Sequence, residues 1–314
     1  MRVKPAYTHL LLFLIANLGI GISQEKNDNI FIFKFSYQVL FSRTGKTEAW
    51  IPLPASNAFQ KIDHLNIQSP RPYRIEKDSV YTNTILHLYP FTVEKPETLT
   101  VTFKVQRREV HAYQESMDEN TRALFLQPYQ KVPLDPQFRI IADSLLQFSG
   151  NQVRRIYDFI LNYMEYDKSG FGWGQGDARY ACAIGRGNCT DYHSFFNALI
   201  RSEYIPARFN IGFSIPADSA GIITGYHCWT EYYDSEKGWI PVDISEADRH
   251  PQLIDYYFGH LDNRRVTFTV GRDIPLPGAI PGDKANFLVY PYVKINKSPS
   301  SDVETRFFYK LLPQ

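Results

Sequence analysis

The stretch that decides the fold is residues 180–243, which carries three short motifs: GRGNCTDYH at 185–193, GYHCWTE at 225–231 and GWIPVD at 238–243. The motifs contain Cys189, His227 and Asp243. A thiol is a useful nucleophile only as the thiolate, so it needs a base within hydrogen-bond reach and a third group that fixes the tautomer of that base. We therefore take Cys189, His227 and Asp243 as the candidate catalytic residues.

The residues after Cys189 have the period of an amphipathic helix. Its apolar face is formed by Tyr192, Phe195, Phe196, Leu199 and Ile200. This spacing places Cys189 at or just before the first turn of the helix. There the helix dipole and the unpaired amides stabilise a thiolate, and the same amides can donate to an oxyanion. We expect Asp191 to stabilise the same turn.

Two further helices are expected before Cys189. Asp135-Pro136 is a typical helix start, an N-cap followed by proline at the first helical position, and Gly150 ends that pattern. A second helix is expected from Asn151, because apolar residues then recur at helical spacing. The loop 168–177 has four glycines around Trp173 and is a candidate wall of a cleft.

A strand pattern contains His227 and Cys228. Successive side chains of a strand point to opposite faces. If His227 points at Cys189, we therefore expect Cys228 to point away from it, either packed or bonded to Cys182. Three cysteines in an exported chain leave at least one unpaired, and we expect this one to be Cys189.

The first half of the chain has the period of half-buried strands. Alternating patterns run through 30–41, 48–53, 80–88 and 99–110, with prolines between them. We predict an antiparallel β-sandwich over residues 24–112, a linker over 113–134 and an α+β catalytic domain over 135–314. The tail after Pro251 is expected to complete the second domain.

The N-terminus has the pattern of an export signal. Arg2 and Lys4 precede an apolar run that ends in Gly21-Ile22-Ser23, a small-x-small cleavage site, so we predict a signal peptide over 1–23. An uncleaved anchor is the alternative, but the apolar run is short for a bilayer. We expect a periplasmic or extracellular protein without stable membrane insertion after cleavage.

The composition is that of an ordinary globular protein, with 44% hydrophobic and 21% charged residues. The formal net charge of +1 argues against a nucleic-acid partner, which would call for a clustered basic excess. The sequence does not indicate the oligomeric state.

With these motifs in view, the second half of the chain resembles the transglutaminase-like superfamily, whose fold is related to that of papain-like cysteine proteases. The stretches GNCTDY, GYHCWTE and GWIPVD stand in the order of that family. The sandwich in front and the tail from Tyr257 to Asp273 are similar to those of its secreted bacterial members. The resemblance thus implies a papain-like α+β domain behind a β-sandwich.

The resemblance also implies thiol-dependent acyl transfer at an amide. Cys189 would attack a carbonyl of a protein or peptide substrate, His227 would move the proton, and Asp243 would orient His227. The backbone amide of Cys189 would be one oxyanion donor, and Trp173 or Gln175 the other. Hydrolysis is favoured because water is abundant outside the cell. The alternatives are Gln-Lys cross-linking by a transglutaminase and a binding scaffold without turnover.

No cofactor or metal is expected. The side chains of Cys182, Cys189, His193, His227 and Cys228 could be considered as zinc ligands. However, the sequence has no CxxC pair, and Cys182 and Cys189 lie too far apart for the usual ligand spacing. It also has no acidic loop of the calcium-binding D-x-D-x-D-G type.

Overall fold

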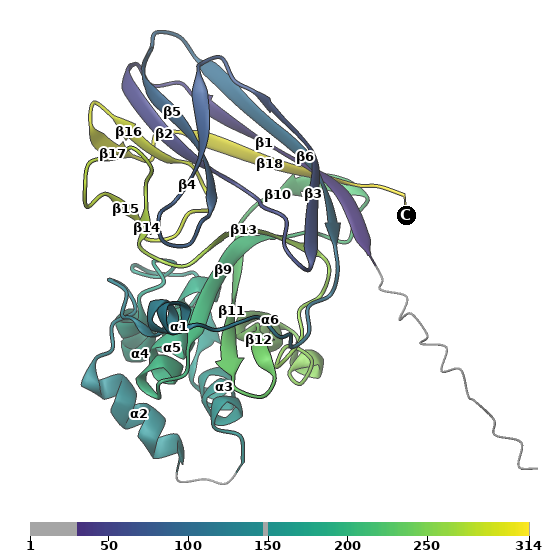
Figure 1. The fold of residues 1–314 in the computed structure, drawn as a ribbon, viewed down its shortest axis with the longest axis vertical. Helices are drawn as coiled ribbons and strands as arrows, with labels where there is room; N and C mark the ends of the chain where they lie inside the picture. The colour runs from purple at the N-terminus through teal and green to yellow at the C-terminus, as the bar shows by residue number, and fades with distance from the viewer. Residues whose placement is uncertain (1–29, 147–149, 314) are drawn as a thin grey trace, which may run out of the picture.

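The computed structural model describes residues 30–146 and 150–313. Two five-stranded antiparallel sheets lie above a part in which helices surround a four-stranded sheet (Figure 1). The predicted α+β class is confirmed. The predicted signal peptide, residues 1–23, falls outside the described residues. Within the described ranges no helix has the length and apolar character needed to cross a membrane.

The first sheet of the sandwich has the strand order β10-β18-β1-β6-β3. Its strands are β1 (Phe31–Phe41), β3 (Gln60–Gln68), β6 (Glu97–Arg107), β10 (Ala220–Ile223) and β18 (Glu304–Leu311). Strand β1 lies in the middle, antiparallel to both neighbours, with Phe35 opposite Phe103 on one side and Tyr309 on the other.

The second sheet has the strand order β17-β16-β2-β5-β4. Its strands are β2 (Gly45–Leu53), β4 (Tyr73–Lys77), β5 (Thr84–Val93), β16 (Tyr292–Ile295) and β17 (Ser298–Ser300). The sequence pattern had not indicated β3 or β4, whose side chains are largely exposed. The expected strand at 80–88 starts later, because residues 78–83 form a turn held by the carboxylate of Asp78.

The core of the sandwich is formed by every second side chain of its strands, as β1 illustrates. Phe33, Phe35, Tyr37 and Val39 are at most 1% exposed, and they alternate with more exposed residues. The Phe35 and Phe103 rings stack with their centroids 5.2 Å apart. Alternation of this kind is what one buried face of a strand requires.

The end of the chain differs from the predicted boundaries. We expected 135–314 to form one domain, but β16, β17 and β18 complete the two sheets of the sandwich. The reason is that β1 and β2 each need a partner on the side not taken by β6 or β5. The predicted linker 113–134 also contains a helix, α1 (Glu119–Leu126), capped by the side chain of Asp118.

The helical part is built around a sheet of order β12-β11-β9-β13. Its strands are β9 (Ala207–Ser214), β11 (His227–Asp234), β12 (Gly238–Val242) and β13 (Arg265–Val270). The helices are α2 (Pro136–Leu146), α3 (Gln152–Tyr163), α4 (Ala178–Ile184), α5 (Cys189–Ser202), α6 (Ile244–Arg249) and the short 3-10 helix η1 (Pro251–Leu253). Two small pairs remain. The pair of β7 (Glu165–Tyr166) with β8 (Arg186–Gly187) belongs to the helical part, whereas the pair of β14 (Ile274–Pro275) with β15 (Lys284–Ala285) packs against Trp50 and Ile85 of the sandwich.

The predicted helices α3 and α5 are confirmed in this part. The side chain of Asn151 caps α3, as its sequence suggested. The apolar face of α5 packs with α2, α3 and the four-stranded sheet in one buried cluster. Helix α5 is buried along nearly its whole length, which fixes the position of its first residue, Cys189.

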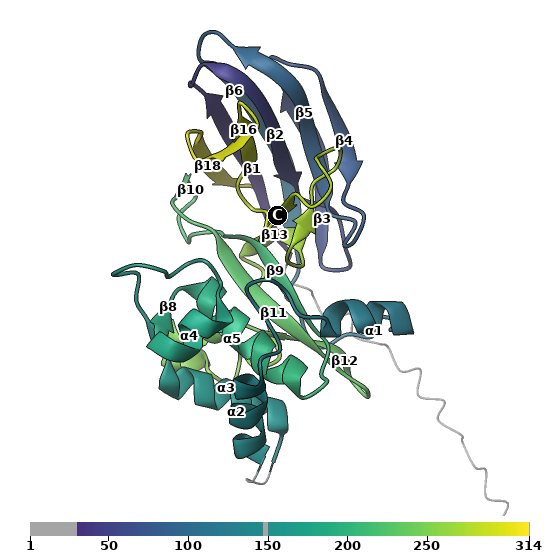
Figure 2. The ribbon, with the colours of Figure 1, turned by 90° about the vertical axis from the view of Figure 1, so that its left-hand side faces the viewer.

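The two parts of the molecule share a core. Figure 2 shows β9 and β13 rising from the helical part to the base of the sandwich. The Phe35 ring centroid of β1 lies 5.4 Å from that of Phe213 in β9 and 5.6 Å from that of Phe268 in β13. The sandwich is therefore packed directly on one side of the sheet that carries His227.

Candidate active site

Cys189 is the first residue of α5, in agreement with its predicted position. The side chain of Asn188 accepts hydrogen bonds from the backbone N–H of Thr190 at 3.0 Å and from its hydroxyl at 2.6 Å. In return, the carboxylate of Asp191 accepts from the backbone N–H of Asn188 at 3.0 Å. This capping box fixes the helix start and leaves the thiol at the positive end of the helix.

Asp191 also anchors the glycine-rich loop. Its carboxylate accepts the backbone N–H groups of Gly174 at 2.7 Å and of Gly176 at 3.0 Å. Burial raises the pKa of Asp191 to about 6, although these hydrogen bonds act in the opposite direction. Gly176 has a φ of +59°, and a Cβ there would come within 2.9 Å of the Arg272 guanidinium, so glycine fits this position best. The loop is thus held against the start of α5.

His227 and Asp243 form a buried pair. The Nε2 of His227 lies 2.7 Å from Oδ2 of Asp243, whose side chain is fully buried. The same Oδ2 accepts from Nη1 of Arg265 at 2.9 Å, and Oδ1 accepts from the hydroxyl of Ser245 at 3.1 Å. Burial alone would raise the pKa of Asp243, but His227 and Arg265 hold it well below its usual range. Asp243 is therefore an anion that fixes one nitrogen of the imidazole.

The thiol of Cys189 faces the other side of that imidazole. Burial raises the pKa of Cys189, but hydrogen bonds with Cys228 and His227 outweigh burial and lower this pKa to about 5. Burial likewise lowers the pKa of His227, whereas Asp243 and Cys189 outweigh it and raise this pKa to about 10. Because Nε2 is taken by Asp243, Nδ1 is the nitrogen left to share the proton of the thiol. Both shifts favour a thiolate and an imidazolium as the state of the pair at neutral pH.

The predicted orientation of Cys228 is wrong. Its thiol is hydrogen-bonded to Cys189 and lies 3.4 Å from Nδ1 of His193. The face of β11 that carries Cys228 is packed on α5, where Cys189 is the first residue. His227 is the first residue of β11, so strand alternation constrains its side chain least. Both residues can therefore reach the same thiol.

The three cysteines form no disulfide with one another. Cys182, Cys189 and Cys228 are free, so the disulfide considered between Cys182 and Cys228 is absent. Burial, and then the neighbouring Cys189, raises the pKa of Cys228, which keeps it a protonated donor. The ring of His193 accepts the backbone N–H of Ile244 at Nε2, 3.1 Å away. Burial lowers the pKa of His193 to about 4, so the neutral ring carries its proton on Nδ1 and donates toward Cys228.

His193, Cys228 and Arg265 are thus parts of the site that the sequence analysis did not assign to it. His193 follows Cys189 by one helical turn and Cys228 follows His227 directly, so their positions carried a signal. Arg265 carried none, because it lies on β13 and reaches Asp243 only through the fold.

The second oxyanion donor stays a prediction. Gln175 is exposed, and its backbone carbonyl accepts from Nδ2 of Asn286 at 2.8 Å. Trp173 is half-buried in the same loop. Closer to the thiol, Nδ2 of Asn188 donates to the hydroxyl of Tyr226 at 3.0 Å. The hydroxyl of Tyr226 is held in turn 3.3 Å from the carbonyl of Gly174, which orients this polar group beside Cys189.

The site is closed in this structure. Cys189 is 1% exposed and His227 6%. The ring of Tyr226 packs against the rings of Phe287 and Tyr290, each at a centroid distance of 5.7 Å. Among the residues described, no group of three or more His, Cys, Asp and Glu side chains is arranged to hold a metal ion.

Sequence comparisons find a family model and a relative that this chain resembles. Residues 141–244 match the model of the transglutaminase-like superfamily. A Haemophilus influenzae protein, described as uncharacterized, is 23% identical in an alignment of 349 positions that covers 94% of each chain.

Solved structures provide a second comparison. The fold is similar to that of a Cytophaga hutchinsonii protein described as a candidate cysteine protease, with a TM-score of 0.63 and 18% identity over 91% of this chain and 92% of that one. The periplasmic domain of TgpA from Pseudomonas aeruginosa is less similar, with a TM-score of 0.37 and 19% identity over 71% and 73% of the two chains. The resemblance drawn from the motifs is confirmed: residues 141–244 match the model of the transglutaminase-like superfamily, and the fold of the chain is similar to that of the Cytophaga hutchinsonii protein.

Proposed function

We propose that the protein is an exported cysteine hydrolase that cleaves a peptide or amide bond through an acyl-thioester on Cys189. The observation that carries the proposal is the buried line of thiol, imidazole and carboxylate, with His227 and Asp243 2.7 Å apart. This arrangement holds a thiolate ready beside a proton donor, which amide cleavage requires.

The reaction divides into two halves. The thiolate of Cys189 attacks the carbonyl carbon, the imidazolium of His227 gives its proton to the leaving amine, and a thioester forms as the C–N bond breaks. Water then attacks the thioester, His227 takes a proton from the water, and the C–S bond breaks, which releases the acid product and returns the Cys189 thiolate beside the imidazolium. The backbone N–H of Cys189, at the start of α5, is in place to donate to the oxyanion in both halves.

Two features support a peptide substrate and an external location. The fold is shared with a protein described as a candidate cysteine protease. Residues 1–23 have the charge and apolar pattern of a signal peptide. Fractionation of cells that express the full chain tests the location, and N-terminal sequencing of the mature protein locates the cut.

The test of the reaction is incubation of the mature protein with a peptide and amine library, with cleavage, ammonia release and amine incorporation followed in parallel. We expect cleavage that is absent in Cys189→Ala and retained in Cys182→Ala, a thiol away from the site. Amine incorporation in place of cleavage would show a cross-linking enzyme instead. Absence of all three, together with an inert Cys189 thiol toward a covalent probe, would show a scaffold without turnover.

A further inference from the structure

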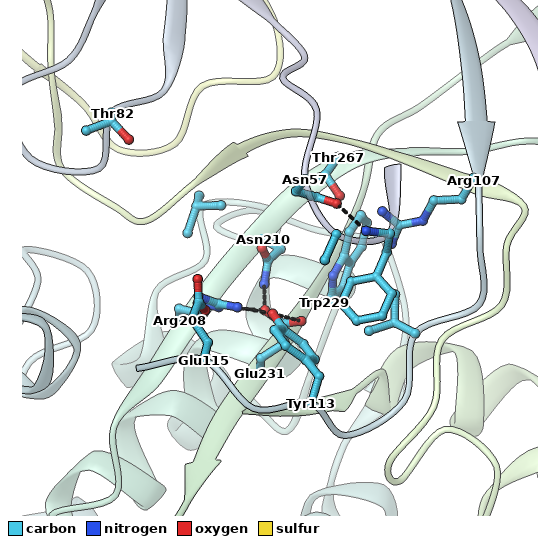
Figure 3. A pocket seen from close by; sticks show the side chains of 14 residues that line it. Asn57, Thr82, Arg107, Tyr113, Glu115, Arg208, Asn210, Trp229, Glu231 and Thr267 are labelled. Atoms are coloured by element: carbon cyan, nitrogen blue, oxygen red, sulfur yellow. Dashed lines mark hydrogen bonds and ion pairs between the residues drawn. The ribbon is translucent and has the colours of Figure 1, made fainter. Parts of the chain in front are cut away.

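A cavity lies between the sandwich and the sheet of the helical part. Its volume is about 320 Å³. The end of β6, the turn 57–59 before β3 and the chain around Tyr113 form one wall, and β9, β11 and β13 form the other (Figure 3). Cavities of this size at the junction of two parts of a protein commonly bind small molecules.

Arg107 is the charged group at the wall formed by the sandwich. It is the last residue of β6 and continues the buried face of Leu99, Val101, Phe103 and Val105. The side chain is 2% exposed and lines the cavity. Among the residues that the structure describes, its Nε has no hydrogen-bond partner. Buried polar atoms of proteins are almost always paired, so this Nε lacks a partner that such an atom normally has.

The nearby carboxylates are already matched by other arginines. Glu231 accepts from Nε of Arg208 at 2.6 Å, and Nη1 of Arg208 reaches Glu115 at 2.9 Å. Figure 3 shows this cluster and Arg107 on opposite sides of Trp229. The lining therefore holds two arginines and two glutamates, and both glutamates are bonded to Arg208 rather than to Arg107.

Arg265 holds the next two carboxylates. It bridges Asp262 and Asp243, so neither carboxylate is free for Arg107. Burial and then the charge of Arg265 lower the pKa of Arg107 to about 10, so Arg107 is still a cation at neutral pH. A buried cation whose neighbouring carboxylates are bonded to other arginines is costly, and an anion hydrogen-bonded to Arg107 would relieve that cost.

Aromatic side chains form the rest of the wall near Arg107. The rings of Phe59 and Tyr113 meet edge to face at 4.7 Å, and Trp229 lies 1% exposed beside them. The Trp229 ring centroid is 6.2 Å from that of His227, and the guanidinium of Arg265 lies 5.0 Å from it. The cavity is thus one side chain away from the catalytic pair.

We propose that this cavity binds a small organic carboxylate, with the carboxylate on Arg107 and the apolar body against Phe59 and Trp229. A guanidinium binds a carboxylate through two parallel hydrogen bonds, which gives both strength and orientation. A free small acid and the carboxyl end of a peptide both present such a carboxylate.

Calorimetric titration of the full mature protein with benzoate, and with benzamide as the neutral ligand of the same shape, tests the proposal. We expect benzoate to bind roughly tenfold or more tightly than benzamide, because a charged hydrogen bond to a buried group is lost with the amide. Arg107→Gln should abolish the preference. Lys34→Gln, which removes one positive charge from the exposed face of the same sheet, should keep it.

Three results would overturn the proposal. They are equal affinity for benzoate and benzamide, no binding of either benzoate or the peptide acid named below, and a preference for benzoate that survives in Arg107→Gln. If Arg107→Gln does not fold, Arg107→Lys keeps the charge without the planar fork and should weaken benzoate severalfold. A hexapeptide that ends in phenylalanine, as free acid and as C-terminal amide, distinguishes the sources. If the peptide acid binds and benzoate does not, the cavity takes the carboxyl end of a peptide chain.

Discussion

The core of the sandwich and the core beneath Cys189 are built in different ways. Between the two five-stranded sheets, aromatic and aliphatic side chains such as Phe35 and Phe103 are packed against one another. Around the start of α5, the buried groups include Asp243, His227 and Arg265, and each is hydrogen-bonded to another. Apolar burial stabilises the first core. In the second core, burial of charged groups costs free energy of folding, but their charges are useful in chemistry.

This difference predicts that the two cores respond differently to substitution. In the charged core a change should remove activity with a modest effect on folding. In the apolar core it should remove stability and leave the activity of each folded molecule intact.

The largest effect is expected for Asp243→Asn. The change keeps the shape of the side chain but removes the charge that holds the imidazolium of His227, so kcat/KM should fall roughly 10³- to 10⁴-fold. The measurement is peptide cleavage by the purified variant, with circular dichroism to confirm the fold. Asp248→Asn is the matched control, because Asp248 lies on α6, the helix that Asp243 caps, and its carboxylate accepts from the hydroxyl of Tyr192 at 3.0 Å and from the backbone of Tyr166. Equal losses in the two variants would contradict the role of Asp243.

Phe35→Ala is the corresponding change in the apolar core. Phe35 is fully buried, so the cavity and lost contacts should cost about 3–5 kcal/mol of unfolding free energy in urea. We expect kcat per folded molecule to stay near the wild-type value. A kcat that falls with the stability would show that the two cores are not separate in function.

The sequence made the apolar core easier to predict than the charged one. The alternation through Phe33, Phe35 and Tyr37 is local, and so is the helical period after Cys189, and both predicted the observed elements. The pairing of Phe35 with Tyr309 joins the two ends of the chain, and no local pattern specifies it.

The same limit applies to the site. The order of Cys189, His227 and Asp243 is visible in the sequence as motifs, and the structure brings His227 and Asp243 within 2.7 Å. The position of Cys228 depends on how β11 meets α5, which strand alternation alone predicted wrongly. The partnership of Arg265 with Asp243 is a tertiary contact, so it became visible only in the structure.

A smaller effect is expected for Cys228→Ala. Because the Cys228 thiol helps to lower the pKa of Cys189, its loss should raise that pKa by about one unit, the equivalent of one charged hydrogen bond. The pH dependence of the thiolate absorbance, taken as Cys228→Ala minus Cys228→Ala/Cys189→Ala, measures the shift. Cys228→Ser retains a donor and should keep most of the lowered value, whereas Cys182→Ala should have no effect. An unchanged midpoint in Cys228→Ala would rule out this contribution.

The smallest effect compares two helix caps. Asn188→Ala removes the cap of α5 and Asn151→Ala that of α3, and each should cost about 1 kcal/mol in unfolding free energy. Only Asn188→Ala should also raise the pKa of Cys189, since only α5 begins at the thiol. Denaturant unfolding and thiol titration on both variants test this, and an equal pKa in the two would count against the helix start as a stabiliser of the thiolate.

The most direct measurement of the central claim is titration of the thiolate itself. Ultraviolet absorbance of the thiolate, taken as wild type minus Cys189→Ala, needs no reagent to enter the closed site. The Cys189 pKa is lowered to about 5, so the thiolate signal should be present above that pH and be lost as the pH falls through it. In His227→Gln, without the imidazolium, the midpoint should move to the ordinary thiol value of about 8.5 or higher. A wild-type midpoint that already lies at the ordinary value, or one that does not move in His227→Gln, would contradict a preformed thiolate–imidazolium pair.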